Sequence, residues 1–139
     1  MSKQIGFSLI ELMAVLAITS ILASLAYTNY NDRIIRAHRL DGKLSLLSLA
    51  QKIERFSMYE HTYKMSPELK QRLPHQSDNG LYTLSIIRAT DLAFTVQATP
   101  TKNQTDTECE SFTFDQNGHK GLAAGPDGEP TGDVITCWN

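Results

Sequence analysis

The apolar residues of this 139-residue chain are concentrated in one run near its N-terminus. Residues 7–26, FSLIELMAVLAITSILASLA, carry one formal charge, that of Glu11. A helix rises about 1.5 Å per residue, so a run of this length spans about 30 Å, the thickness of the hydrocarbon core of a bilayer. The pattern therefore predicts a membrane-spanning helix over 7–26, and a buried helix of a soluble protein is the alternative.

The helical pattern continues beyond the apolar run. Gly42 is the only Gly or Pro between Tyr27 and Tyr59, so we expect one helix over 7–60. Its later part carries two apolar stripes on roughly opposite faces, one of Leu40, Leu44 and Leu47 and the other of Leu46, Leu49, Ile53 and Phe56. We expect one stripe to pack on the chain's own domain and the other on neighbouring subunits. A helix sandwiched within the monomer is the alternative.

Alternation of apolar and polar residues predicts a small antiparallel sheet after the helix. The expected strands are 81–88, 92–98 and 111–115, and the short connection at 89–91 suits a hairpin. The side chains expected to face inward are Tyr82, Leu84, Ile86, Leu92, Phe94, Val96, Ala98, Phe112 and Phe114. Residues 66–80 are expected to be an irregular connector, and 134–138 a final strand or a packed tail. The predicted fold class is α+β, a long N-terminal helix packed on a small antiparallel sheet.

Composition adds limits to this fold. Hydrophobic residues make up 41% and charged residues 20% of the chain, which excludes a disordered protein or a coiled-coil rod. Thirteen Lys and Arg against fifteen Asp and Glu give a net charge of −2, so bulk charge does not support DNA binding. A local patch of Lys102 and Lys120 would still permit it.

No arrangement of residues suits catalysis. The four histidines have no zinc-site spacing to one another or to the cysteines, and no phosphate loop or nucleophile motif occurs. Asp127, Glu129 and Asp133 lack the ligand spacing of an EF-hand, so an acidic turn is favoured over a calcium loop. We expect no enzyme activity, no metal and no cofactor.

Two cysteines, Cys109 and Cys137, enclose a stretch rich in Gly and Pro. A disulfide closing a loop of this length would stabilise the fold by about 3–4 kcal/mol on the chain-entropy model. Such pairs fit an oxidising compartment. Two unpaired buried thiols in a cytoplasmic chain are the alternative.

The residues around Glu11 resemble the processing motif of type IV prepilins. In the string KQIGFSLIELMAVLAI, Gly6 ends a short leader that contains Lys3, Phe7 follows it, and Glu11 comes four residues later inside the apolar run. The resemblance implies cleavage after Gly6 and N-methylation of Phe7. Glu11 would then be an assembly residue, because its carboxylate could pair with the new cationic amine of a neighbouring subunit and fix the axial register.

The same resemblance implies an organisation for the whole chain. It has a leader over 1–6, a helix over 7–60 with its membrane segment at 7–26, and a globular head over 61–139. Within the head, Cys109 and Cys137 resemble the pair that bounds a surface loop in type IV pilins, here 109–137. Ser20 and Thr28 stand where type IV pilins commonly have a Gly and a Pro, so we expect a continuous helix.

The implied protein is a subunit of a bacterial type IV pilus, most like a minor pilin. It would be held in the inner membrane with its C-terminal domain in the periplasm, and then built into or prime an extracellular fibre for attachment, twitching motility or DNA uptake. The implied partners are other pilins, a prepilin peptidase and N-methyltransferase, the inner-membrane assembly platform and membrane lipids. A major pilin and a type II secretion pseudopilin are the alternatives within the family.

Two further observations keep other interpretations open. Arg33, Arg36 and Arg39 follow the apolar run, and the positive-inside rule applied alone would place the C-terminal domain in the cytoplasm. Together with Lys43, these arginines would contact anionic headgroups or acidic patches on neighbouring subunits, or form a solvated face. From a different class of protein, a cleavable secretory signal would leave a periplasmic binding domain that begins at Tyr27.

Overall fold

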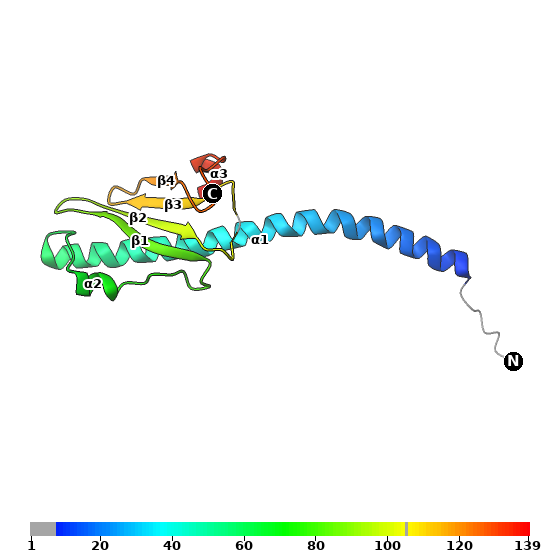
Figure 1. Ribbon diagram of the computed structural model, residues 1–139, viewed down its shortest axis with the longest axis horizontal. Coiled ribbons are helices and arrows are strands. Elements are labelled where there is room, and N and C mark those ends of the chain that lie inside the picture. Colours follow the sequence, from blue (N-terminus) through cyan, green and yellow to red (C-terminus); the bar gives the residue numbers. More distant parts are fainter. Residues whose placement is uncertain (1–7, 105) are drawn as a thin grey trace. The chain divides into compact units, whose positions relative to one another are not determined.

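The computed structural model describes residues 8–104 and 106–139, apart from the side chains of residues 26–29. Its elements are, in chain order, α1 (Leu9–Glu60), α2 (Pro67–Gln71), β1 (Tyr82–Ala89), β2 (Phe94–Pro100), β3 (Ser111–Asp115), β4 (Lys120–Ala123) and α3 (Val134–Trp138) (Figure 1). The chain divides into two compact units within α1, between Ile34 and Ile35. The second unit, Ile35–Asn139, contains the later part of α1 and every strand, and we call it the head unit.

Helix α1 is unbroken over 52 residues, as predicted from a segment in which Gly42 is the one Gly or Pro. In its apolar part the hydroxyls of Thr19, Ser20 and Ser24 donate to backbone carbonyls three or four residues earlier, at 2.7–3.1 Å. Polar groups in this part are therefore satisfied within the helix itself. That is the condition for placing them in a medium without water.

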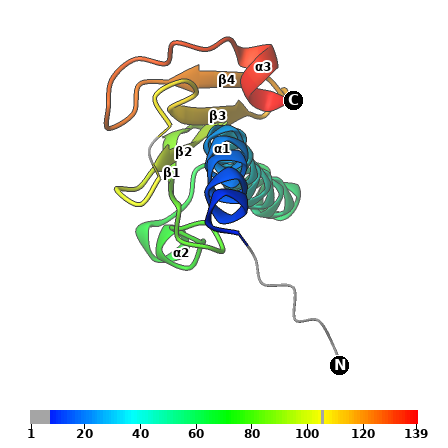
Figure 2. The same cartoon turned by 90° about the vertical axis from the view of Figure 1, so that its right-hand side faces the viewer.

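The strands form one antiparallel sheet in the order β1-β2-β3-β4. The register runs from Tyr82 opposite Pro100 to Ala89 opposite Phe94 in the first pair, with an irregularity between Ile86 and Arg88. Seen along α1, the sheet lies on one side of the helix in the head unit, and α3 lies beside the outer strand β4 (Figure 2).

The core forms where one face of α1 meets the sheet. Leu46, Leu49 and Ile53 are at most 1% exposed and pack with the buried side chains Tyr82, Leu84, Phe94, Val96, Ala98 and Phe112. Gly42 permits the closest approach, because a Cβ atom there would lie 2.7 Å from the Tyr82 ring. The opposite stripe of α1 is not covered within the described chain, so the sandwiched-helix alternative is wrong.

Strands β1, β2 and β3 lie within two residues of their predicted bounds, whereas the turn before β2 differs from the prediction. β3 was predicted at its observed bounds, whereas β1 begins one residue later than expected and β2 two residues later. Leu92, expected inside, is 86% exposed because it precedes β2, in a turn that Thr90 closes with hydrogen bonds to Ala93. β4 was not predicted at all, since KGLA contains too little alternation to indicate a strand.

Two short helices also replace predicted irregular or extended segments. α2 interrupts the expected connector because Ser66 Oγ accepts from the Leu69 amide at 3.3 Å and Pro67 occupies the first helical turn. α3 replaces the strand considered for 134–138, because Asp133 Oδ1 accepts from the Thr136 amide at 2.7 Å and caps a helix; the segment is packed, with Cys137 and Trp138 buried. In both cases a side chain within three residues decides the local structure.

Candidate functional site

The first candidate surface is the apolar part of α1. Every described side chain between residues 8 and 25 is exposed, and this part of α1 is long and apolar enough to cross a membrane, with a mean hydropathy of 2.2 over its best window. An uncovered apolar surface of this length is unstable in water. It therefore requires lipid or the helices of other subunits around it.

Glu11 is the one acid in this surface. Its Oε2 accepts a hydrogen bond from the Ser8 amide at 3.4 Å, and the Ser8 carbonyl accepts from the Glu11 and Leu12 amides. This is the acidic half of a capping box, which satisfies one of the free amides at the start of a helix. The carboxylate remains exposed and can accept a second, cationic partner. Gly6 and Phe7 lie outside the described residues, so their roles stay predictions.

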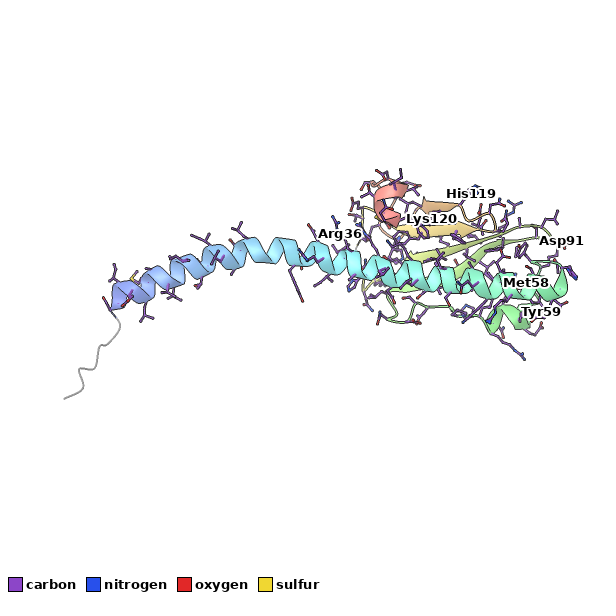
Figure 3. The ribbon with its side chains drawn as sticks, turned by 180° about the vertical axis from the view of Figure 1, so that it is seen from behind. Arg36, Met58, Tyr59, Asp91, His119 and Lys120 are labelled. Atoms are coloured by element: carbon purple, nitrogen blue, oxygen red, sulfur yellow. A yellow bond between two sulfur atoms is a disulfide. The ribbon has the colours of Figure 1, made fainter. Side chains whose placement is uncertain are left out.

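The second candidate surface is the outer stripe of α1, which we define as Leu40, Leu44, Leu47 and Met58. Leu40, Leu44 and Met58 are each more than half exposed, and Met58 projects from the end of the helix (Figure 3). A groove of about 570 Å³ adjoins the stripe and is lined by Leu47, Ala50, Gln51, Glu54, Arg55, Met58 and Phe114. The surface is mostly apolar and suits a contact with another helix.

A buried ion pair joins α1 to the loop that leads into the disulfide. Arg39 is 7% exposed, and its Nε and Nη2 donate to Asp106 Oδ2 and Oδ1 at 2.6 and 2.8 Å. Nη2 also donates to Glu108 Oε2 at 2.6 Å. Burial alone would lower the pKa of Arg39, but these hydrogen bonds raise it. The expectation that Arg39 and Lys43 belong to a solvated or lipid-facing cluster is wrong, because both side chains are buried within the head unit, whereas Arg36 projects from the helix surface (Figure 3).

Lys43 makes a second link one helical turn later. It is 9% exposed, and its Nζ donates to the carbonyls of Cys137 and Asn139, each at 3.2 Å. Burial lowers its pKa, and the positive charges of Arg39 and Lys120 lower it further. Together Arg39 and Lys43 hold both ends of the cystine loop against α1.

The predicted disulfide is present. Cys109 and Cys137 are bonded at an S–S distance of 2.00 Å with their Cα atoms 5.7 Å apart. Trp138 follows and packs edge-on to Phe112 at 5.5 Å between ring centroids, and its Nε1 donates to the Gly121 carbonyl at 3.0 Å. The loop between the cysteines is thus fixed at its ends by covalent, polar and aromatic contacts.

Lys102 and Lys120 do not form the single patch considered from the sequence. Lys102 follows the end of β2, which lies beside the start of β3, whereas Lys120 pairs with Phe114 near the opposite end of β3. Lys120 also lies over the Trp138 ring, with Nζ 5.3 Å from its centroid, and is labelled beside His119 in Figure 3.

Unpaired cationic side chains gather instead around the connector between α1 and β1. Two small pockets there share Pro74 and Leu84; Lys70 and His75 line one of about 200 Å³, and Lys52 lines the other, of about 110 Å³. Arg72 follows α2 on the same segment and is exposed. Within the described residues none of the cations Lys52, Lys70 and Arg72 has an acidic partner at ion-pair distance, although Asp78 lines the smaller pocket. We call Lys52, Lys70 and Arg72 the connector cations.

Two acids considered for a calcium loop lie in local turns or caps. Asp133 caps α3, and Asp127 belongs to the turn between Gly125 and Gly128. Among the described residues, one group of three close metal-ligating side chains occurs, Asp106, Glu108 and Cys109. Asp106 and Glu108 both form ion pairs with Arg39, and the sulfur of Cys109 is bonded in the disulfide. This group therefore does not suit a metal ion.

A long apolar helix, a four-stranded antiparallel sheet and a cystine loop near the end of the chain define a pilin. The sequence matches two family models, and the description of the first is type IV minor pilin ComP, DNA uptake sequence receptor, matched over residues 28–113. The second is the prokaryotic N-terminal methylation motif, matched over residues 1–27. The chain belongs to the type IV minor pilin ComP family. Pilins of this family and fold are structural subunits and not enzymes.

A solved structure supports the fold. The chain is similar to the non-core minor pilin PilV of Neisseria meningitidis, with a TM-score of 0.57 and 23% identity over 73% of this chain and 98% of that one. It also matches a type IV pilin from Shewanella oneidensis, with a TM-score of 0.42 and 21% identity over 62% of this chain and 89% of that one.

The connector cations and the partners of Arg39 were not found from the sequence. Asp106 is 67 residues from Arg39, and no periodic pattern links the two. Lys70 and Arg72 lie in the connector 66–80, which was expected to be irregular, so the sequence did not indicate that they lie near Lys52 of α1.

Proposed function

We propose that this chain is a minor subunit of a type IV pilus that binds DNA during uptake. The family match over residues 28–113 carries this proposal, because that family is described as a DNA uptake sequence receptor. A subunit of this kind contributes a binding surface to the fibre. Attachment and twitching motility are the alternatives to DNA uptake.

The assembly route follows from the N-terminal motif. A prepilin peptidase cuts after Gly6, and Phe7 is N-methylated and bears a cationic amine. The methylation-motif match over residues 1–27 and the exposure of the apolar helix support this route. Glu11, exposed on that helix, then accepts the amine of a neighbouring subunit, and a subunit out of register leaves a charge unpaired at a cost of several kcal/mol.

We further propose that the head unit lies in the periplasm before assembly. The disulfide between Cys109 and Cys137 supports this orientation, since such bonds persist in oxidising compartments. The positive-inside rule predicted a cytoplasmic head from Arg33, Arg36 and Arg39. Burial of Arg39 in an ion pair removes one of these three arginines from the membrane-proximal surface and weakens that prediction. The outer stripe of α1 then contacts other pilins in the fibre.

We place the DNA contact at the connector cations. Affinity for DNA comes largely from cations that neutralise phosphates, whatever the net charge of the protein. Lys52 and Lys70 line two pockets that share Pro74 and Leu84, and Arg72 follows Lys70 on the connector; none of the three has an acidic partner among the described residues. The cations Lys102 and Lys120 instead lie near opposite ends of β3.

Salt-dependent DNA binding tests both parts of this proposal. Fluorescence anisotropy would measure binding of a labelled duplex to the full chain in detergent micelles between 50 and 200 mM salt. Lys70→Ala/Arg72→Ala should reduce the slope of log K against log salt by about 2, since each lost phosphate contact removes about 1. Lys102→Ala/Lys120→Ala changes the net charge equally and should leave the slope unchanged.

The possible failures are distinguishable. Equal losses in the two double variants would contradict the connector site but leave DNA binding in place. No binding by the unaltered chain at the lowest salt would contradict the DNA proposal itself. Presence of the chain in purified fibres would still support the role as a pilus subunit.

A further inference from the structure

Glu110 is a buried carboxyl group that no part of the assembly or DNA-binding account uses. It follows Cys109, is 1% exposed, and neither carboxylate oxygen has a hydrogen-bond partner among the described residues. Its backbone has a φ of +48°, a left-handed conformation that costs energy for a residue other than glycine. An unpartnered carboxylate in such a position is unfavourable when ionised.

A tight turn covers this carboxyl. The turn runs from Gly125 to Gly128, whose amides and carbonyls bond each other at 2.9 and 3.4 Å. A Cβ atom on Gly125 would overlap the Glu110 carboxylate, so only glycine allows the backbone to lie this close. The Ser111 hydroxyl donates to the Ala124 carbonyl at 3.0 Å and holds the strand side of the turn. We call residues 125–128 the covering turn.

The charged groups that act on Glu110 are acids. Burial raises the pKa of the Glu110 carboxyl, and the negative charges of Asp127 in the covering turn and Asp106 before the disulfide raise it further. The backbone amide of Asp127 lowers the pKa of Glu110, but it does not reach hydrogen-bond geometry with either Glu110 carboxylate oxygen. Asp106 is already paired with Arg39 of α1, which leaves Asp127 as the unpaired like charge.

We propose that Glu110 is a proton-dependent latch, in which the covering turn closes over the protonated carboxyl and lifts when the carboxyl loses its proton to solvent. The closed form holds one proton more than the open form. Its stability is therefore complete below the ordinary pKa of a glutamate and decreases as pH rises through the higher pKa of the closed state. Because the disulfide fixes Cys109 and Cys137, the movement is confined to the surface of the cystine loop.

Hydrogen exchange on the full chain in detergent micelles tests the latch. In the open form the covering turn also loses the two hydrogen bonds between Gly125 and Gly128, so the protection factors of these two amides, corrected for intrinsic rates, would be measured from pH 4 to pH 8. We expect protection to fall by up to tenfold per pH unit through the titration. The core amides of β2 should not change with the same midpoint.

Three substitutions assign the proton. Glu110→Gln cannot ionise and should make the protection of both amides independent of pH. Asp127→Asn removes the like charge and should move the midpoint to lower pH. Glu129→Gln, an exposed acid of the same loop, is the matched control and should leave the profile unchanged.

Two results would overturn the proposal. One is protection at Gly125 and Gly128 that does not depend on pH in the unaltered chain. The other is pH dependence that persists in Glu110→Gln. If that variant does not fold by circular dichroism, Asp127→Asn decides alone, and an unmoved midpoint contradicts the latch.

Discussion

The two parts of α1 show how one helix can serve two environments. In the first part, the described side chains of residues 8–25 are all exposed and nearly all apolar. In the second, Leu46, Leu49 and Ile53 are buried by the chain's own sheet. The first part is therefore exposed over its described length and requires lipid or other subunits to cover it, whereas the second is stabilised within the head unit.

Polar groups differ between the two parts in the same way. Thr19 and Ser24 in the first part bond to carbonyls of their own helix, whereas Arg39 and Lys43 in the second bond to residues about 70 to 95 positions away. Glu11 in the first part also accepts a hydrogen bond at the start of its own helix, but its charged carboxylate remains exposed and can bind a further partner. Changes in the first part should thus affect assembly, and changes in the second should affect folding.

The largest effect is expected at Glu11. Glu11→Val removes the partner proposed for the amine of the neighbouring subunit, and an unpaired charge in a low-dielectric fibre core costs several kcal/mol, or about 100-fold or more in incorporation. Quantitative immunoblots of sheared fibres would measure this, with membrane fractions showing normal insertion. Ser20→Val, on the same apolar helix, should incorporate normally. Equal incorporation of Glu11→Val and the unaltered chain would refute the assembly role.

Arg39→Met should produce the largest loss of head stability. It leaves Asp106 buried without its ion-pair partner, which costs about 3–5 kcal/mol. Urea unfolding of the full chain in micelles, followed by the fluorescence of the single tryptophan, would report it. The exposed Arg36→Met is the control and should stay within about 0.5 kcal/mol. A small effect at Arg39 would mean that the pair adds little to the fold.

Loss of the disulfide should come next. Cys109→Ser/Cys137→Ser opens a loop of 28 residues, and the chain-entropy model gives a loss of about 3–4 kcal/mol. The same urea titration would measure it, and reduction of the unaltered chain should give a similar shift. A shift well below 1 kcal/mol would show that Arg39 and Lys43 suffice to hold the loop.

Alkaline pH should destabilise the head through Tyr82. Burial raises the pKa of Tyr82 to about 12, while the hydrogen bond from Gln104 lowers it and Asp106 raises it. The neutral phenol is therefore favoured in the folded state, and about 2–3 kcal/mol of stability present below pH 10 is lost as pH rises towards 12. Tyr82→Phe should remove this pH dependence. Identical alkaline curves for the two proteins would contradict it.

The smallest effect on folding is expected on the outer stripe. Leu44→Ser alters a side chain that is 58% exposed, so head stability should change by less than about 0.5 kcal/mol. Its incorporation into fibres should nevertheless decrease, because the stripe is proposed to contact other pilins. Leu49→Ser, on the buried face, should instead destabilise the head. A variant of Leu44 that folds and assembles normally would argue against the stripe as an interface.

Patterns within one element were predictable from the sequence, and contacts between distant elements were not. The apolar run, the buried stripe of α1 and β3 follow from periodicity, and the cysteine pair follows from their count and the resemblance. Burial of Arg39 required Asp106, and the separation of Lys102 from Lys120 required the strand register. α2 and α3 begin at the N-caps Ser66 and Asp133. Both caps lie among Gly, Pro and Asp residues typical of turns, so the sequence predicted no helix there.

The most direct test is the intact mass and N-terminus of this chain in sheared and purified fibres. The account predicts a chain that begins with N-methylated Phe7, present in small amounts relative to the main subunit. A chain that retains residues 1–6, that begins at Tyr27, or that is missing from fibres which otherwise form would contradict it.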